Sequence, residues 1–134
     1  MSFDGLRDFA LLLGRLGLGV VFLLHGWQKF FDTGLGTVAG QFQTIGVPQP
    51  EITAAAVAGV ELVCGIALVL GILTPLAGIL LAVDMLGAFY FVHATHGPFV
   101  ENQGWELVVA LFVGVVMLAA VGAGRFSLDH VLGG

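Results

Sequence analysis

Charge is scarce in this sequence. Only 10% of its 134 residues are charged, with four Lys/Arg against nine Asp/Glu, whereas an ordinary soluble domain carries about 25% charge. Four cations are too few to neutralise a run of phosphates, which excludes an electrostatic nucleic-acid binder. The single cysteine, Cys64, excludes an intrachain disulfide, a paired-cysteine redox motif and a cysteine-rich zinc site.

Motifs for several enzyme classes are also missing. The sequence has no nucleophile elbow, phosphate-binding loop or zinc-protease motif, which excludes a hydrolase. It has no haem-attachment, flavin or nicotinamide motif either. Any electron transfer would therefore depend on a bound quinone or on a partner that carries the redox centre.

Apolar residues, by contrast, are abundant, at 58% of the chain. Four continuous apolar runs cover residues 9–31, 51–73, 75–93 and 105–121. A helix that spans a bilayer needs roughly 20 apolar residues, and the runs lack the alternation of spanning strands. We therefore expect an all-α fold, a single integral-membrane domain over residues 1–134 that forms a four-helix bundle. No cleavable signal peptide is expected, because Arg15 interrupts the first run and acidic residues precede it.

The connections between the runs differ. The second and third runs are joined by a short turn that ends at Pro75, which predicts an antiparallel helical hairpin. Residues 32–50 fit either a short helix in the membrane interface or an irregular glycine-rich loop. Small residues four apart permit close helix approach in three runs: Ala55/Gly59, Gly78/Ala82 and Ala110/Gly114.

The few cations predict an orientation. An even number of spans places both termini on one side, together with Arg7 and Arg125 and with Arg15 just inside the first span. Lys29 alone lies toward the opposite side. The positive-inside rule then places both termini in the cytoplasm of a bacterial inner-membrane protein.

Three charged residues fall inside the predicted spans: Arg15, Glu61 and Asp84. Each would cost about 2.5–3.5 kcal/mol at the centre of a lipid-facing helix, so they are expected to face the bundle interior. The simplest arrangement is one Arg–carboxylate network in which the second carboxylate carries a proton, unless Lys29 reaches inward. The alternative is a network that only fixes the register of the helices.

A second polar cluster is expected nearer the outer face. His25 and Lys29 share a helix face, and His93 lies at a similar depth on the third span. His96 follows in the last connection, and Glu106 lies at the start of the fourth run. The cluster suits a quinone head group or an anion, and a metal held by His93, His96 and Glu106 is a weaker alternative. These residues also fit a purely interfacial role, with polar ends that reach water.

Several short motifs resemble the DoxX family, in the right order and over essentially the whole chain. They are Arg15-Leu-Gly-Leu-Gly, His25-Gly-Trp-Gln-Lys29-Phe, Glu61-Leu-Val-Cys-Gly, Gly71-Ile-Leu-Thr-Pro75, Asn102-Gln-Gly-Trp-Glu106 and Gly122-Ala-Gly-Arg-Phe-Ser-Leu-Asp129. The resemblance implies a four-helix bacterial inner-membrane protein. Relatives include the membrane subunit of thiosulfate:quinone oxidoreductase and a component of a membrane oxidoreductase complex with a sulfurtransferase and a superoxide dismutase. Residues Arg15, His25, Lys29, Glu61 and Glu106 match recurrent polar positions of that family.

Together these observations predict a small membrane subunit that passes electrons from a sulfur compound or a partner oxidoreductase to quinone. Glu61 and His25 are the expected catalytic residues. The expected ligand-binding residues are Arg15, His25, Lys29, Asp84, His93 and Glu106. One alternative is a scaffold that anchors soluble redox proteins on a cytoplasmic face with Asp4, Arg7, Asp8, Arg125 and Asp129. A homo-oligomer of the chain is a further alternative to a single copy. A less favoured one is a small transporter.

Overall fold

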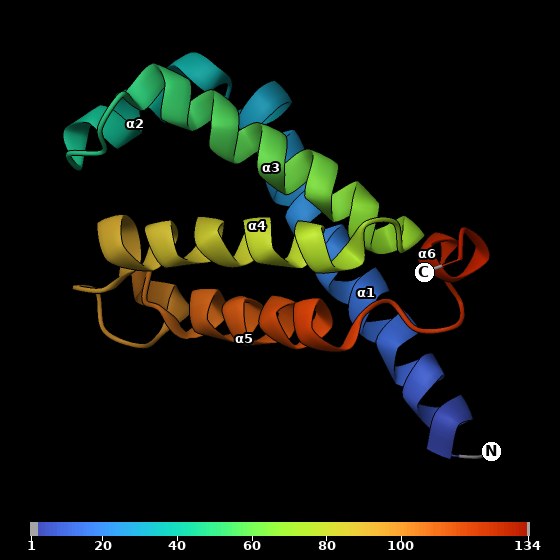
Figure 1. Cartoon of the computed structure of the whole chain (residues 1–134). Helices are drawn as coiled ribbons and strands as arrows, with labels where there is room; N and C mark the ends of the chain where they lie inside the picture. The colour runs from blue at the N-terminus through green and yellow to red at the C-terminus, as the bar shows by residue number, and fades with distance from the viewer. Residues whose placement is uncertain (1–2, 134) are drawn as a thin grey trace.

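The computed structural model describes residues 3–133, and these residues form helices and connections without a strand (Figure 1). The elements are α1 (Phe3–Trp27) with its π-helical continuation η1 (Gln28–Asp32), α2 (Leu35–Thr44), α3 (Pro50–Leu70), α4 (Thr74–Ala88) with the π-helical continuation η2 (Phe89–His93), the short 3-10 helix η3 (Val100–Asn102), α5 (Glu106–Val121) and α6 (Leu128–Val131). The prediction of an all-α fold is confirmed. Residues 32–50 contain a helix, α2, rather than only an irregular loop.

Three helical segments are long and apolar enough to cross a membrane: Phe3–Asp32, Pro50–Leu70 and Thr74–His93. They correspond to the first three predicted spans, although the first begins six residues earlier than the predicted residue 9. The fourth predicted span becomes α5, an apolar helix of 16 residues. It is slightly shorter than the roughly 17–25 residues of a typical spanning helix.

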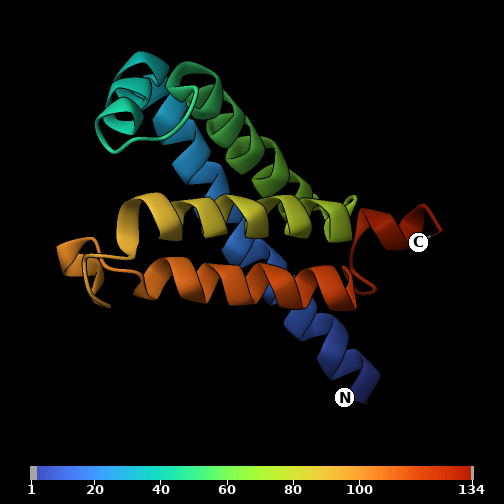
Figure 2. The same ribbon diagram turned by 60° about the vertical axis from the view of Figure 1, so that its left-hand side comes forward.

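The four long helices form two antiparallel pairs, α1 with α3 and α4 with α5 (Figures 1 and 2). Helix α1 crosses the α4–α5 pair obliquely, and α3 and α4 are joined by the expected hairpin. From that hairpin α3 and α4 spread apart toward the end of the molecule opposite the chain termini, which we call the distal end. A core that includes Phe22, Leu68, Leu81 and Val115 joins the two pairs.

Glycines bring α1 and α3 close together. A β-carbon at Gly65 would lie 2.5 Å from the backbone nitrogen of Leu23, and one at Gly26 would lie 2.4 Å from that of Leu62. Only glycine permits such backbone approach. In the other pair, a β-carbon at Gly78 would lie 2.9 Å from the carbonyl oxygen of Val115, whereas one at Gly59 would meet nothing within 4 Å. Of the predicted small-residue contacts, the one at Gly78 is therefore present and the one at Gly59 is not.

The C-terminal segment closes the α3–α4 hairpin. Leu73 precedes α4 in a left-handed conformation and provides no side-chain cap. The cap comes instead from Asp129, whose carboxylate oxygens accept hydrogen bonds from the backbone N–H groups of Leu73 at 2.7 Å and Thr74 at 2.9 Å. The backbone N–H of Asp129 donates in turn to the carbonyl oxygen of Gly71 at 2.8 Å. A carboxylate at a helix N-terminus satisfies free N–H groups and complements the helix dipole.

This cap makes stability depend on pH. Partial burial raises the pKa of Asp129, but the hydrogen bonds from Thr74 and Leu73 and the charge of Arg15 outweigh it, so the pKa lies below its ordinary value of 3.8. A lowered pKa stabilises the fold above pH 3.8, and this contribution is lost as the pH falls through the folded-state pKa.

We therefore expect Asp129→Asn to lower the free energy of unfolding at neutral pH by about 1 kcal/mol. It should also weaken the loss of stability as the pH falls from about 5 through the folded-state pKa. Thermal unfolding in detergent at several pH values measures both effects. Asp32→Asn, at an exposed carboxylate at the end of η1, is the control. Equal pH dependence in wild type and Asp129→Asn would contradict the assignment.

Candidate functional site

A cavity of about 620 Å³ lies where α3 and α4 spread apart. Its walls come from α1 and η1, from Phe42 and Val47 in and after α2, from the facing sides of α3 and α4, and from the start of α5. Most lining side chains are apolar. The few polar ones include His25, Lys29, Glu61, Asp84 and His93. Small-molecule sites have this composition, an apolar cleft of about 300–1,000 Å³ with a few polar groups.

An ion pair forms the polar centre of the cavity. The Nζ atom of Lys29 lies 2.5 Å from Oε1 of Glu61, and their side chains are 22% and 5% exposed. Glu61 belongs to α3, whereas Lys29 belongs to the π-helical segment η1 at the end of α1. π-Helical turns are rare and occur frequently at functional sites. The second such segment, η2, carries His93 on another wall of the same cavity.

A second carboxyl group faces this ion pair. Asp84 of α4 lines the cavity and interacts with Glu61 across the gap between α3 and α4. Its Oδ2 atom is buried and has no hydrogen-bond partner within residues 3–133. A buried carboxyl oxygen without a partner is costly, so it marks a position at which a ligand or a water molecule would be stabilised.

Two histidines line the cavity from different elements, His25 from α1 and His93 from η2. His25 lies one helical turn before Lys29 on α1 and lines the cavity. His93 also lines it, and its Nδ1 atom hydrogen-bonds to the carbonyl oxygen of Gln103 at 2.6 Å. A carbonyl only accepts, so Nδ1 of His93 carries the proton in this hydrogen bond.

Arg15 departs from its predicted position. The sequence predicts that it joins Glu61 and Asp84, but it lies at the opposite end of α3 and does not line the cavity. Its buried guanidinium donates to the carbonyl oxygens of Leu68 at 3.2 Å and Val69 at 3.4 Å. A further hydrogen bond of 2.5 Å reaches the carbonyl oxygen of Phe126. The carbonyl oxygen of Leu68 also accepts from the backbone N–H of Gly71 at 3.2 Å, so Arg15 adds to the cap of α3, whereas Lys29 lies beside Glu61.

The last connection, residues 94–105, has its own polar scaffold. Oε1 of Glu106 accepts a hydrogen bond from the backbone N–H of Val100 at 3.1 Å, and Glu106 does not line the cavity. His96 is exposed and does not line it either. Within residues 3–133 no group of three or more His, Cys, Asp or Glu side chains is placed to hold a metal ion. His93, His96 and Glu106 therefore do not form the weak metal site that the sequence suggests.

Sequence reasoning missed the apolar walls. On α3 the lining residues Thr53, Ala56, Val57, Val60 and Glu61 occupy positions i, i+3, i+4, i+7 and i+8, which is the spacing of one helix face. This spacing is visible in the sequence. Every face of a membrane helix is apolar, however, so the sequence does not distinguish a face that lines a cavity from one that contacts lipid. Cys64 lies buried in the core, as an inert packing residue would.

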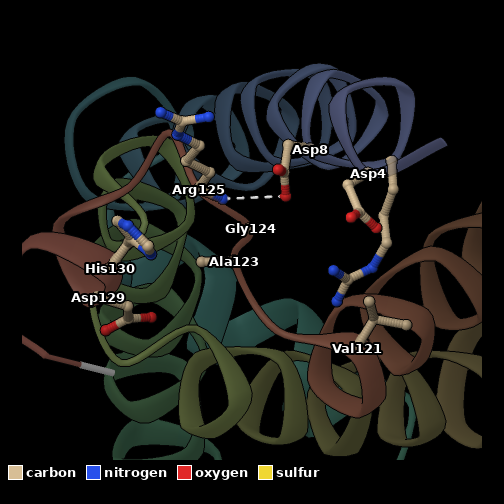
Figure 3. A pocket seen from close by; sticks show the side chains of 9 residues that line it. Asp4, Asp8, Val121, Ala123, Gly124, Arg125, Asp129 and His130 are labelled. Carbon is tan, nitrogen blue, oxygen red and sulfur yellow. Dashed lines mark hydrogen bonds between the residues drawn. The ribbon is translucent and has the colours of Figure 1, made fainter. Parts of the chain in front are cut away.

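A second cavity, of about 490 Å³, lies at the end that holds both termini (Figure 3). It is lined by polar residues that the sequence assigned to the cytoplasmic face: Asp4, Arg7, Asp8, Arg125 and Asp129. Figure 3 shows Asp8 of α1 beside the segment Ala123–Arg125, where its Oδ1 atom accepts a hydrogen bond from the backbone N–H of Arg125 at 3.2 Å. Opposite charges alternate around this cavity, so its surface has no strong field of one sign.

Long apolar helices around an internal polar site define a multi-pass membrane protein, because polar groups inside a bilayer are stable only where they face the protein interior. The DoxX family model matches residues 10–94. The chain belongs to the DoxX family, and it is a bacterial inner-membrane protein.

Its relatives carry little functional description. The chain is 36% identical to an uncharacterized membrane protein of Mycobacterium tuberculosis over 88% of this chain and 78% of that protein. It is 30% identical to a Bacillus subtilis protein named "Putative oxidoreductase CatD", over 91% of this chain and 86% of that protein. It is 27% identical to the inner membrane protein YqjF of Escherichia coli, over 95% of both chains. No solved structure matches it significantly.

Proposed function

We propose that this chain is the quinone-binding membrane subunit of a redox system, which passes electrons to quinone from a sulfur compound or a partner oxidoreductase. The observation that carries the proposal is the Lys29–Glu61 ion pair beside Asp84 in an otherwise apolar cavity of about 620 Å³. The name of the Bacillus subtilis relative points to the same class of activity.

The residues present fit a quinone. Its ring is apolar and flat, and it requires hydrogen-bond donors only at its two oxygens. The cavity provides apolar contacts from side chains such as Phe22, Val108 and Leu111, and donors from Lys29 and His25. The carboxyl group of Asp84 lines the same cavity and interacts with Glu61.

Each polar residue has a distinct part. A bound quinone supplies an acceptor of two electrons and two protons. The ammonium of Lys29 would stabilise negative charge on an oxygen near it. The carboxyl groups of Glu61 and Asp84 interact and can hold a proton between them for delivery to that oxygen. His25 would orient the ring through a hydrogen bond from the α1 wall.

The electrons must come from outside this chain, because its sequence contains no motif for a redox cofactor. The cavity at the terminal end, lined by Asp4, Arg7, Asp8 and Arg125, could receive a soluble protein, but it lies away from Lys29 and Glu61, so we do not place the electron donor there. This surface also supports the alternative function of a membrane scaffold for redox proteins.

The proposed topology has four spans and both termini in the cytoplasm. At 1.5 Å per residue, the 16 residues of α5 extend about 24 Å, which is slightly less than the hydrocarbon thickness of about 30 Å. Because α5 packs along α4, the neighbouring helix can shield its ends. Arg7 and Arg125 at the terminal end support the orientation through the positive-inside rule.

Two glycines provide a matched test of quinone binding. Gly87 lines the cavity, whereas Gly59 lies in α3 outside it, and a β-carbon at either meets nothing within 4 Å. Replacing a helical glycine by leucine also favours the helix by up to about 1 kcal/mol, so both variants should fold.

We expect Gly87→Leu to fill the cavity and weaken quinone binding by about tenfold or more. Gly59→Leu should bind as the wild type does. Titration of the purified protein in lipid nanodiscs with a ubiquinone or menaquinone analogue measures the effect. Wild-type affinity in Gly87→Leu, or equal losses in both variants, would contradict binding in this cavity.

A further inference from the structure

We infer that the cavity opens sideways into the bilayer between α3 and α4, and that the opening receives the alkyl tail of the bound molecule while its polar head lies at Lys29, Glu61 and Asp84. The inference rests on the proposed function and adds the class of ligand, a lipid-soluble amphiphile, and its route of entry.

The exposed lining residues indicate where the cavity opens. Val83 is 61% exposed and Leu80 is 40% exposed, and both line the cavity from α4. Ala56 on α3 is likewise exposed and lines it. Leu80 lies six residues, or about 9 Å, from the hairpin end of α4, and Ala56 lies six residues from the distal end of the antiparallel α3. Both positions lie well inside helices of spanning length, where exposure is to hydrocarbon and not to water.

The other sides of the cavity are covered by protein, which leaves the gap between α3 and α4 as the route of entry. The distal end is partly covered by α2 and its following residues, through Phe42 and Val47, and by the connection that carries Gln103 and Gly104. Helices α1 and α5 form the back wall through Phe22 and Leu111, both buried. The gap between α3 and α4 widens from their hairpin toward the distal end (Figures 1 and 2).

The side chains at the edges of the opening are apolar, as the alkyl tail of an amphiphile is. The three exposed residues at its edges are purely apolar, whereas the side chains of the ion pair are less exposed, at 22% for Lys29 and 5% for Glu61. An amphiphile with its head at the ion pair would thus leave its apolar chain between α3 and α4. A charged, water-soluble ligand would gain little from this opening, because Leu80, Val83 and Ala56 at its edges are apolar.

The test compares two ligands: a benzoquinone ring with a decyl tail, and the same ring without the tail. Val83→Trp narrows the opening from the α4 side, and Ala56→Trp narrows it from the α3 side. Met117→Trp is the control, because Met117 of α5 is also 61% exposed but does not line the cavity. Each affinity is measured in nanodiscs and divided by the wild-type value for the same ligand, so that partitioning into lipid cancels.

We expect Val83→Trp and Ala56→Trp to weaken binding of the tailed quinone by about tenfold, equivalent to about two buried methylene groups. Binding of the tailless ring should stay within about twofold of wild type, and Met117→Trp should change neither affinity. Unchanged binding of the tailed quinone in both opening variants, or equal losses for both ligands, would overturn the lateral opening and leave the proposed function standing. A wild-type protein that binds neither ligand would instead overturn the proposed function.

Discussion

Replacing either member of the Lys29–Glu61 pair by methionine is expected to lower the free energy of unfolding by about 3 kcal/mol. In each single variant the remaining charge keeps its place in an apolar cavity but loses the partner 2.5 Å away. The double variant Lys29→Met/Glu61→Met removes both charges and should lie within about 1 kcal/mol of wild type, since apolar replacements of buried ion pairs are often neutral.

Unfolding by increasing the fraction of sodium dodecyl sulfate in mixed micelles measures the three free energies. The double variant separates stability from function, because it should fold as well as the wild type and yet bind quinone poorly. Additive losses in the double variant would show that the two side chains do not interact energetically.

The second large effect is expected at Arg15. Its guanidinium donates three hydrogen bonds to backbone carbonyls from a fully buried position, and hydrogen bonds to charged groups contribute about 1.5–3 kcal/mol each. Arg15→Met should therefore lower the free energy of unfolding by about 4 kcal/mol. Arg15→Lys should recover only part of this, because an ammonium lacks the planar fork that reaches α3 and Phe126 together.

A local measurement complements the global one. Without Arg15 the segment at Phe126 loses its tie to α3, so trypsin should cleave after Arg125 faster than in wild type. Arg7→Met is the matched control, an exposed arginine of the same helix replaced by the same residue. Equal cleavage rates in Arg15→Met and wild type would show that Arg15 does not hold the segment.

Much of the fold follows from the sequence. Continuous apolar runs of spanning length predict helices over residues 51–73 and 75–93, because no other structure satisfies every backbone polar group in lipid. Pro75 after a short turn predicts the hairpin. The sequence also predicts that Glu61 and Asp84 face the interior, since charged residues toward lipid would be too costly.

The pairing of those charges could not be predicted. Arg15 and Lys29 are both cations of the first span, and the choice between them depends on how α1 crosses α3. Gly26 and Gly65 set that crossing, because a β-carbon at either would meet the backbone of the facing helix. The chain has 21 glycines, and nothing in the sequence distinguishes these two from the others. The π-helical turn at Lys29 also changes the helix face on which the Lys29 side chain lies. No residue type predicts a π-helical turn.

The candidate site, like the fold, could be predicted from the sequence only in part. Sequence reasoning found the polar residues of the cavity, His25, Lys29, Glu61, Asp84 and His93, because polar residues are conspicuous in an apolar chain. It also assigned Arg15 and Glu106 to the site, whereas the structure places them in the scaffold. A side chain that satisfies a helix end or a loop and one that faces a ligand have the same chemistry, and only the fold distinguishes them.

The central claim is that the cavity around Lys29, Glu61 and Asp84 holds a quinone. Native mass spectrometry of protein extracted gently from quinone-containing membranes tests it most directly. We expect the chain to carry one quinone, and expect Gly87→Leu to lose it while Gly59→Leu retains it. A wild-type chain that carries only phospholipid, or no ligand at all, would contradict the claim and favour a membrane scaffold with structural buried charges.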